Sequence, residues 1–203
     1  MCIRDSSNSL LSWFRLFSVK NIDPTSRTGT YLIEAISELR KEMPNLSELL
    51  SVQIWGDIYP GNAKLIQDLG LDDIIEISGY CSHEETQAKL QSADVLFLPL
   101  ESELDGQAPL HIPGKLYEYL KMDKPILTLC GESDCKEIVR KAGVGEFAEP
   151  KNIPQIKAAL KKLLSNQSKL KEVYQADQEW IESKFSAASL TNQLVKVIQE
   201  LQT

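Results

Sequence analysis

The sequence has little that could hold a metal ion or a disulfide framework. It contains four cysteines and two histidines, and no two of the cysteines form a C-x-x-C pair. The cysteines are Cys2, Cys81, Cys130 and Cys135. Structural zinc sites need close cysteine or histidine spacings, and small secreted scaffolds need paired cysteines. We therefore expect no metal site and no disulfide framework, and a reducing compartment.

Positive charge and long apolar runs are also scarce. Lysine and arginine number 22 against 29 aspartates and glutamates, which gives a formal net charge of -7. Nucleic acid needs a basic footprint, so we expect no nucleic-acid partner. No apolar run approaches the roughly 20 residues of a membrane-spanning helix, and no signal-peptide pattern is present. These absences predict a soluble, cytoplasmic protein with no transmembrane segment.

The lysines that are present gather in the C-terminal third of the chain. The cluster consists of Lys151, Lys157, Lys161, Lys162, Lys169 and Lys171. We interpret it as the solvated face of one or more helices. The alternative is a peripheral contact with an acidic membrane surface, at the inner face of the membrane.

Residues 1–26 differ from the rest of the chain. Met1 to Ser6 (MCIRDS) resembles the translation of sequencing-adapter read-through, and Leu10 to Val19 is apolar without a regular period. We expect this segment to be unreliable as native sequence. We therefore also expect that an N-terminal domain is missing from this sequence.

From residue 27 onward, strand and helix patterns alternate. The predicted strands cover residues 51–55, 74–78, 94–100, 125–130 and 146–148. The predicted helices cover residues 28–42, 63–69, 82–92, 113–122, 135–142, 152–165, 168–183 and 187–202. Ser82 and Glu85 form a capping box, and Ser186 is the expected cap of the last helix.

Strands separated by helices indicate an α/β fold with a doubly wound, Rossmann-like parallel sheet. We expect one domain over residues 27–183 and a separate C-terminal helix within 184–203. Such sheets bind ligands at the carboxyl ends of their strands. This rule selects four loops, which are Gly56-Asp57, Gly79 to His83, Glu101 to Ile112, and Gly131 to Asp134.

The segment from Ile112 to Leu120 carries the richest chemistry. Gly114 leaves backbone amides accessible where a helix begins, and Lys115 adds a positive charge there, so the pattern is typical of an anion site. Pro113 suits the first helical position. Glu118 shares a helix face with Gly114 and Lys115, where it could accept hydrogen bonds from ribose hydroxyls. The alternative is an ordinary surface pair between Lys115 and Glu118.

Two rival motifs are weaker. Gly114-Lys115 is followed by Leu116, so it lacks the Ser or Thr of a phosphate-binding P-loop. Gly143 to Ala148 matches G-x-G-x-x-A, but it follows a helix and not a strand. We expect it to be a turn that ends that helix.

At this point the sequence resembles a known family. The run PGKLYEYL at 113–120, KPILTL at 124–129 and the Ala-Gly-Val-Gly turn at 142–145 resemble the donor-binding half of group 1 retaining glycosyltransferases of the GT-B fold. Arg27 to Ile36 resembles the first helix of that half. Val52 to Gly56, Gly79-Tyr80, and Ser92 to Val95 follow in the family's order, so that the resemblance covers roughly residues 27–200.

The resemblance implies a nucleotide-diphosphate sugar, UDP- or GDP-linked, as donor substrate, with no cofactor and no metal. It implies that Glu118 binds the ribose and that Gly114 and Lys115 hold the diphosphate. The Gly79 turn would line the base, mainly through its backbone, and the first turn of the next helix would lie beside it. The remaining predicted donor-binding residues are Gly56, Gly79, Tyr80, Cys81, Ser82 and His83. An exposed role in helix capping is the alternative for His83.

The chain departs from the family pattern in two places. Many members carry a second, sugar-contacting glutamate eight residues before the ribose-binding one, and Leu110 stands there in this chain. The family's glycine turn after its first strand is not present in Ser18 to Pro24. The predicted function is a hexosyltransferase fragment of polysaccharide or glycoconjugate biosynthesis whose last helix crosses to a missing N-terminal acceptor domain. The alternative is a non-catalytic, Rossmann-like binding or interaction module.

Overall fold

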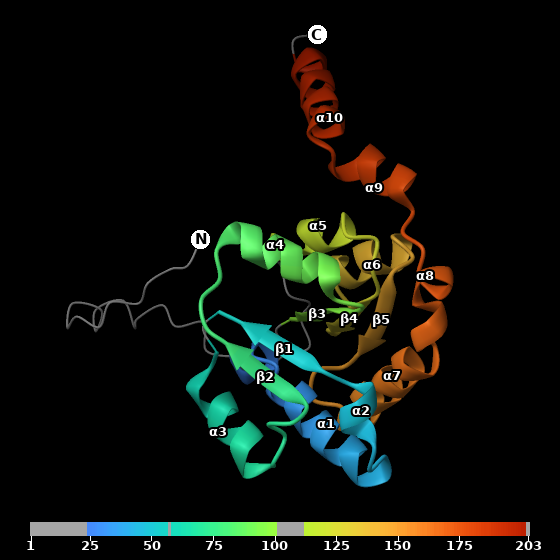
Figure 1. The fold of residues 1–203 in the computed structure, drawn as a ribbon. Helices are drawn as coiled ribbons and strands as arrows, with labels where there is room; N and C mark the ends of the chain where they lie inside the picture. Colours follow the sequence, from blue (N-terminus) through green and yellow to red (C-terminus); the bar gives the residue numbers. More distant parts are fainter. Residues whose placement is uncertain (1–23, 57, 101–111, 202–203) are drawn as a thin grey trace, which may run out of the picture.

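The computed structural model describes residues 24–56, 58–100 and 112–201 (Figure 1). The described strands are β1 (Val52–Trp55), β2 (Ile75–Ser78), β3 (Leu96–Pro99), β4 (Ile126–Leu129) and β5 (Gly145–Ala148). The α-helices before β4 are α1 (Thr30–Glu42), α2 (Leu46–Leu49), α3 (Pro60–Asp68), α4 (His83–Ser92) and α5 (Lys115–Leu120). Those after β4 are α6 (Asp134–Lys141), α7 (Ile153–Ser165), α8 (Leu170–Val173), α9 (Gln178–Phe185) and α10 (Ala187–Glu200). Short 3-10 helices cover Pro24–Arg27 and Gln167–Lys169.

Every strand pairing in the described part is parallel, and helices cover both faces of the strands. One buried cluster joins α1 and α7 to one face, and a second joins α4, α5, α6 and α9 to the other. β4 contributes to both, because successive side chains of a strand point to opposite faces. Leu127 and Leu129 lie in the first cluster and Ile126 in the second. The predicted α/β class with helices on both faces is confirmed.

The strands form two sheets and not the single sheet that the sequence predicts. β1 pairs with β2, and β3, β4 and β5 form a second sheet in that order. Within residues 24–56, 58–100 and 112–201, no strand pairs with both β1 and β3. The two sheets share a hydrophobic core, since Val52 and Ile54 of β1 pack against the cluster that contains Leu127 of β4.

The predicted continuous helix over 168–183 is wrong. The chain leaves helical geometry between α8 and α9 because three tertiary contacts hold it there. Tyr174 is buried, and its hydroxyl donates to Glu146 of β5 at 2.7 Å. The Ala176 N–H donates to Asp123 at 3.0 Å, and the Asp177 N–H donates to the Ala142 carbonyl at 3.0 Å.

Three helices begin two or three residues from their predicted starts, and one of them is α1, which begins at Thr30 and not at residue 28. α3 begins at Pro60 and not at residue 63, because proline is well suited to the first helical position. α5 is shorter than the predicted 113–122, and Gly114 is its N-cap. Pro113 therefore precedes the helix, although its carbonyl still accepts from the Leu116 N–H at 3.0 Å.

Three local predictions about helix ends are confirmed. Ser82 and Glu85 form the reciprocal capping box, in which each side chain accepts from the other residue's backbone N–H. Ser186 caps α10 through the Ser189 N–H. Gly143 follows α6 with φ +79°, a left-handed conformation that L side chains rarely adopt, so the glycine-rich turn does end a helix.

Part of the lysine cluster forms ion pairs. Lys157 and Lys161 of α7 both pair with Glu42 at the end of α1, and Lys162 pairs with Glu146 at 2.7 Å. These contacts join α7 to α1 and to β5. They favour the interpretation that α7 presents a solvated face with its own acidic partners.

α10 extends away from the layered part of the molecule (Figure 1). Among the described elements it packs mainly against α9, and none of its described residues is buried. The apolar side chains Leu190, Leu194, Val195, Val197 and Ile198 are 45–60% exposed. In the described part of the chain, no helix has the length and apolar character needed to cross a membrane.

Candidate functional site

The start of α5 presents the predicted anion-binding face to solvent. Gly114, Lys115 and Glu118 are exposed, whereas Leu116 and Leu120 on the opposite face are buried. The shared face predicted from the 100° helical period is confirmed. Within the described residues no ion pair joins Lys115 to Glu118. The ordinary surface pair between Lys115 and Glu118, which the sequence left as an alternative, is therefore not formed.

The positive charge of a second residue, Arg27, acts on Lys115. Surrounding protein atoms lower the pKa of Lys115, although the residue as a whole is exposed, and the positive charge of Arg27 lowers it further. Arg27 ends the 3-10 helix directly before α1. The segment before α1 and the start of α5 thus each carry a cation, and the two charges interact. A pair of like charges of this kind attracts an anion with more than one negative charge.

The chain around Arg27 is fixed by a buried amide. Gly29 caps α1 with φ +82°, and Asn62 of α3 is only 1% exposed beside it. The Asn62 amide donates to the Thr28 carbonyl at 2.6 Å and accepts from the Thr30 hydroxyl at 2.7 Å. These bonds hold both sides of the turn that follows Arg27.

The loops after β1 and β2 meet at one edge. The Gly56 N–H donates to the Gly79 carbonyl at 3.2 Å, which joins the carboxyl ends of the two strands. Tyr80 is 84% exposed, so its ring is not part of the core. Ser82 and His83 are exposed at the start of α4, in agreement with their predicted positions. The order of the loops places these residues at the carboxyl edge, where parallel sheets bind ligands.

A lysine that the sequence analysis did not single out lies at the same edge. The Lys89 ammonium is 3.1 Å from the Cys81 sulfur and 5.1 Å from the centre of the Trp55 ring. Cys81 in turn donates to the Gly79 carbonyl at 3.7 Å. Trp55 ends β1 and Cys81 follows β2, so Lys89 spans the ends of both strands.

The predicted site residues therefore fall into two groups. Gly114, Lys115 and Glu118 lie at the start of α5, and the residues from Gly79 to His83 lie between β2 and α4 beside Gly56. α4 and α5 belong to the same buried cluster. Some positions that the sequence singles out lie outside the described residues. They are Leu110, His111, Asp57 and the acidic residues of 101–105.

Sequence patterns did not place four residues in the candidate site, namely Arg27, Asn62, Trp55 and Lys89. A basic residue directly before a predicted helix was a visible signal for Arg27. The contacts of Asn62 and Lys89 join segments far apart in the chain, and local spacing carries no signal for them.

The described residues contain no group of three or more metal-ligating side chains. The two cysteines after β4 are buried, and burial raises the pKa of Cys130 to about 12 and that of Cys135 to about 11. Their thiols are therefore protonated at neutral pH and are structural.

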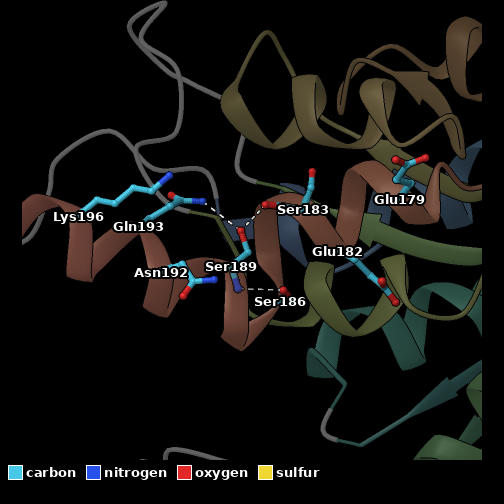
Figure 2. Close-up of a pocket in the computed structure, with 8 residues that line it drawn as sticks. All are labelled: Glu179, Glu182, Ser183, Ser186, Ser189, Asn192, Gln193 and Lys196. Atoms are coloured by element: carbon cyan, nitrogen blue, oxygen red, sulfur yellow. Dashed lines mark hydrogen bonds between the residues drawn. The ribbon is translucent and has the colours of Figure 1, made fainter.

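A polar hollow lies between α9 and α10 (Figure 2). It is lined by Glu179, Glu182, Ser183, Ser186, Ser189, Asn192, Gln193 and Lys196. The Ser189 hydroxyl donates to the Ser183 carbonyl and accepts from Gln193 at 3.2 Å, so the lining side chains are partly bonded to one another. The hollow is open and contains none of the predicted donor-binding residues.

Comparisons with known proteins identify the family and the fold. The family model "Glycosyl transferases group 1" matches residues 3–180. The colanic acid biosynthesis glycosyltransferase WcaL of Salmonella typhimurium is 29% identical over 139 residues, which are 68% of this chain and 34% of that protein. The chain thus spans about a third of this curated relative's length.

Two solved structures share the fold. HepE of Anabaena, solved in complex with UDP, superposes with a TM-score of 0.66 at 14% identity, over 87% of this chain and 46% of HepE. The C-terminal domain of the group 1 glycosyltransferase LpcC from Francisella tularensis gives a TM-score of 0.60 at 17% identity, over 81% of this chain and 83% of that domain. The chain belongs to the group 1 glycosyltransferase family and has the fold of the family's C-terminal GT-B domain.

Proposed function

We propose that this chain is the donor-binding half of a retaining hexosyltransferase, and that it binds a nucleoside-diphosphate sugar. The observation that carries the proposal is that the charge of Arg27 acts on Lys115, one helical turn before a carboxylate, Glu118, that has no ion-pair partner among the described residues. Two cations suit a diphosphate, and a neighbouring carboxylate suits the vicinal hydroxyls of a ribose.

The two cations act mainly through their formal charges. α5 has six residues, so the amides at its start add a smaller contribution than those of a long helix. Charge fixed in place before the reaction stabilises the diphosphate as it leaves the sugar. This role needs no metal ion, because Lys115 and Arg27 supply the positive charge.

The likeness to HepE supports the choice of ligand. HepE has been solved with UDP and with UDP-glucose. UDP and GDP, the nucleotides that the family resemblance implies, are accordingly the ligands to test first.

The proposal also includes a second half of the enzyme, which would bind the acceptor. This chain covers 46% of HepE and 34% of WcaL, and α10 presents an apolar face with no partner among the described residues. We propose that an N-terminal domain binds the acceptor and packs against α10. The alternative is a module that binds a nucleotide without catalysis, and Leu110 in place of the sugar-contacting glutamate favours it.

Two substitutions on α5 test the donor site. Lys115→Met should weaken UDP and GDP binding far more than uridine binding, because it removes a charge beside the diphosphate, and it should flatten the salt dependence. Glu118→Gln should weaken nucleotide and nucleoside alike by roughly ten- to a hundredfold, the range of a charge-assisted hydrogen bond. Affinities are measured by calorimetry.

The matched controls are Lys121→Met, at the other end of α5, and Glu48→Gln on α2, both of which are exposed positions. Neither should change the affinity for UDP or GDP. Affinities that stay unchanged in both Lys115→Met and Glu118→Gln would overturn the donor-site assignment. Donor binding without sugar transfer, once an N-terminal domain is supplied, would support the non-catalytic alternative.

A further inference from the structure

We propose that Lys89, held between Trp55 and Cys81, selects the base of the donor nucleotide and favours uracil and guanine over cytosine and adenine. The inference rests on the proposed function, because it assigns a role within the same donor site. The family resemblance implies that the Gly79 turn contacts the base mainly through its backbone. The inference adds a side chain, Lys89, that recognises the base.

The position of Lys89 is set from two strands. Its ammonium lies 5.1 Å from the centre of the Trp55 ring at the end of β1, and 3.1 Å from the Cys81 sulfur after β2. The Cys81 thiol donates to the Gly79 carbonyl, so its sulfur is left to accept from Lys89. The Gly56 to Gly79 bond holds the two strand ends together. A lysine side chain is otherwise flexible, and these contacts restrict it to one place at the carboxyl edge.

The ammonium keeps hydrogen-bonding capacity for a ligand. Lysine has three N–H donors, and within the described residues Lys89 spends one on the Cys81 sulfur. The carboxylate one turn earlier, Glu85, is engaged in the capping box, and its bonds with Ser82 are the largest cause of its lowered pKa. No ion pair to Lys89 is formed in the described part of the chain. The interaction with the Trp55 ring is electrostatic and uses no N–H direction.

A donor-only group distinguishes bases by their carbonyls. An ammonium can donate to O4 of uracil and to O6 of guanine, which are acceptors. Cytosine and adenine carry amino groups at the corresponding positions, and two donors that face one another form no bond. Because Lys89 is half-buried, a ligand that leaves it unpaired also loses the hydration of the charge. We therefore expect UDP and GDP, which form a hydrogen bond with the Lys89 ammonium, to bind more tightly than CDP and ADP, which leave that charge unpaired.

The test compares matched pairs of ligands, UDP with CDP and GDP with ADP, by calorimetry on the full chain. The wild type should bind UDP more tightly than CDP, and GDP more tightly than ADP, each by roughly tenfold or more, as expected for a bond to a charged group. Lys89→Met should abolish both preferences, because it weakens UDP and GDP binding by the loss of the bond and strengthens CDP and ADP binding by removing the unpaired charge. The control Lys121→Met should preserve both ratios.

A second variant keeps the test independent of folding defects. Lys89→Gln carries both a donor and an acceptor, so it should bind cytosine and uracil nucleotides with similar affinity while its thermal unfolding stays close to that of the wild type. Equal affinities of the wild type for UDP and CDP, or an equal loss for all four nucleotides in Lys89→Met, would overturn base selection by Lys89. The proposed function would stand in that case, provided that Glu118→Gln still weakens binding. If none of the four nucleotides binds to the wild type, the proposed function itself fails.

Discussion

Asn62 bridges Thr28 and Thr30 across the glycine at which α1 begins. Its amide donates to the Thr28 carbonyl and accepts from the Thr30 hydroxyl, at 2.6 and 2.7 Å. Arg27 precedes this turn and its charge acts on Lys115, so the bridge helps to set the position of a charge in the proposed donor site. A side chain in the interior thereby positions a charge at the surface.

Asn62→Ala should destabilise the protein by roughly 1–3 kcal/mol, because it leaves buried polar groups of the turn without partners. It should also weaken UDP binding, since Arg27 loses its fixed position, while leaving uridine binding nearly unchanged. Urea denaturation and calorimetry measure the two effects. Asn45, whose side chain forms no cap bond, provides the control Asn45→Ala. A destabilised variant with unaltered UDP affinity would separate Asn62 from the site.

Thr128, at the centre of β4, carries a buried hydroxyl that has no hydrogen-bond partner in the described structure. Thr128→Val replaces the hydroxyl by a methyl group of similar shape and should stabilise the protein by about 1 kcal/mol. Thr128→Ser keeps the hydroxyl and removes the methyl group, so it should destabilise by about 1 kcal/mol. Thermal and urea unfolding give the comparison, and a less stable valine variant would show that the hydroxyl is satisfied.

Tyr174 should make the stability fall at alkaline pH. Burial, with help from the bond to Glu146 and its charge, raises the pKa of Tyr174 above its ordinary value of 10.0. The folded state therefore holds the phenol proton more tightly than the unfolded state, so this stabilisation is complete below about pH 10 and is lost above it. Tyr174→Phe should cost roughly 1 kcal/mol at pH 7 and remove that part of the alkaline decline.

Urea unfolding between pH 7 and pH 11 measures the effect of Tyr174→Phe. Tyr59 is 48% exposed, and Tyr59→Phe is the matched control, which should keep the decline. An identical alkaline slope in wild type and Tyr174→Phe would assign the decline to other groups.

The apolar face of α10 should contribute to association and not to the stability of this domain. Leu194 is 60% exposed, so Leu194→Gln should change the free energy of unfolding by less than about 0.5 kcal/mol. It should also reduce self-association, measured by sedimentation, because contiguous exposed apolar side chains promote it. Ile181 of α9 is 5% exposed and offers the contrast, since Ile181→Ala should cost roughly 2–4 kcal/mol. A large loss of stability in Leu194→Gln would place α10 in the domain core.

Local rules in the sequence predicted the fold class and the capping of several helices. Ser82 and Glu85 lie within one turn, so their reciprocal capping follows from spacing alone, and the structure confirms it. The buried runs of β3 and β4 likewise predict parallel strands covered on both faces. These features depend on residues close together in the chain.

Features that depend on distant residues were missed. The break between α8 and α9 lies in a segment whose pattern is helical, and it results from Tyr174 bonding to Glu146 and Ala176 bonding to Asp123. The position of Lys89 results from Trp55 and Cys81 in the same way. Helical propensity is a weak preference that such tertiary contacts override.

The crossing of the chain over Gly143 has a consequence for biosynthesis. A side chain at Gly143 would come within 2.7 Å of the Gln175 carbonyl oxygen, so the segment after α8 passes directly over this glycine. It carries the chain from the cluster that holds Tyr174 to the opposite one, which Trp180 and Ile181 help to cover. α9 is thus the last element in the chain to reach that second cluster, whose other buried members come from residues 90–144. We expect a nascent chain that still lacks α9 to expose apolar side chains of this cluster, which favours aggregation.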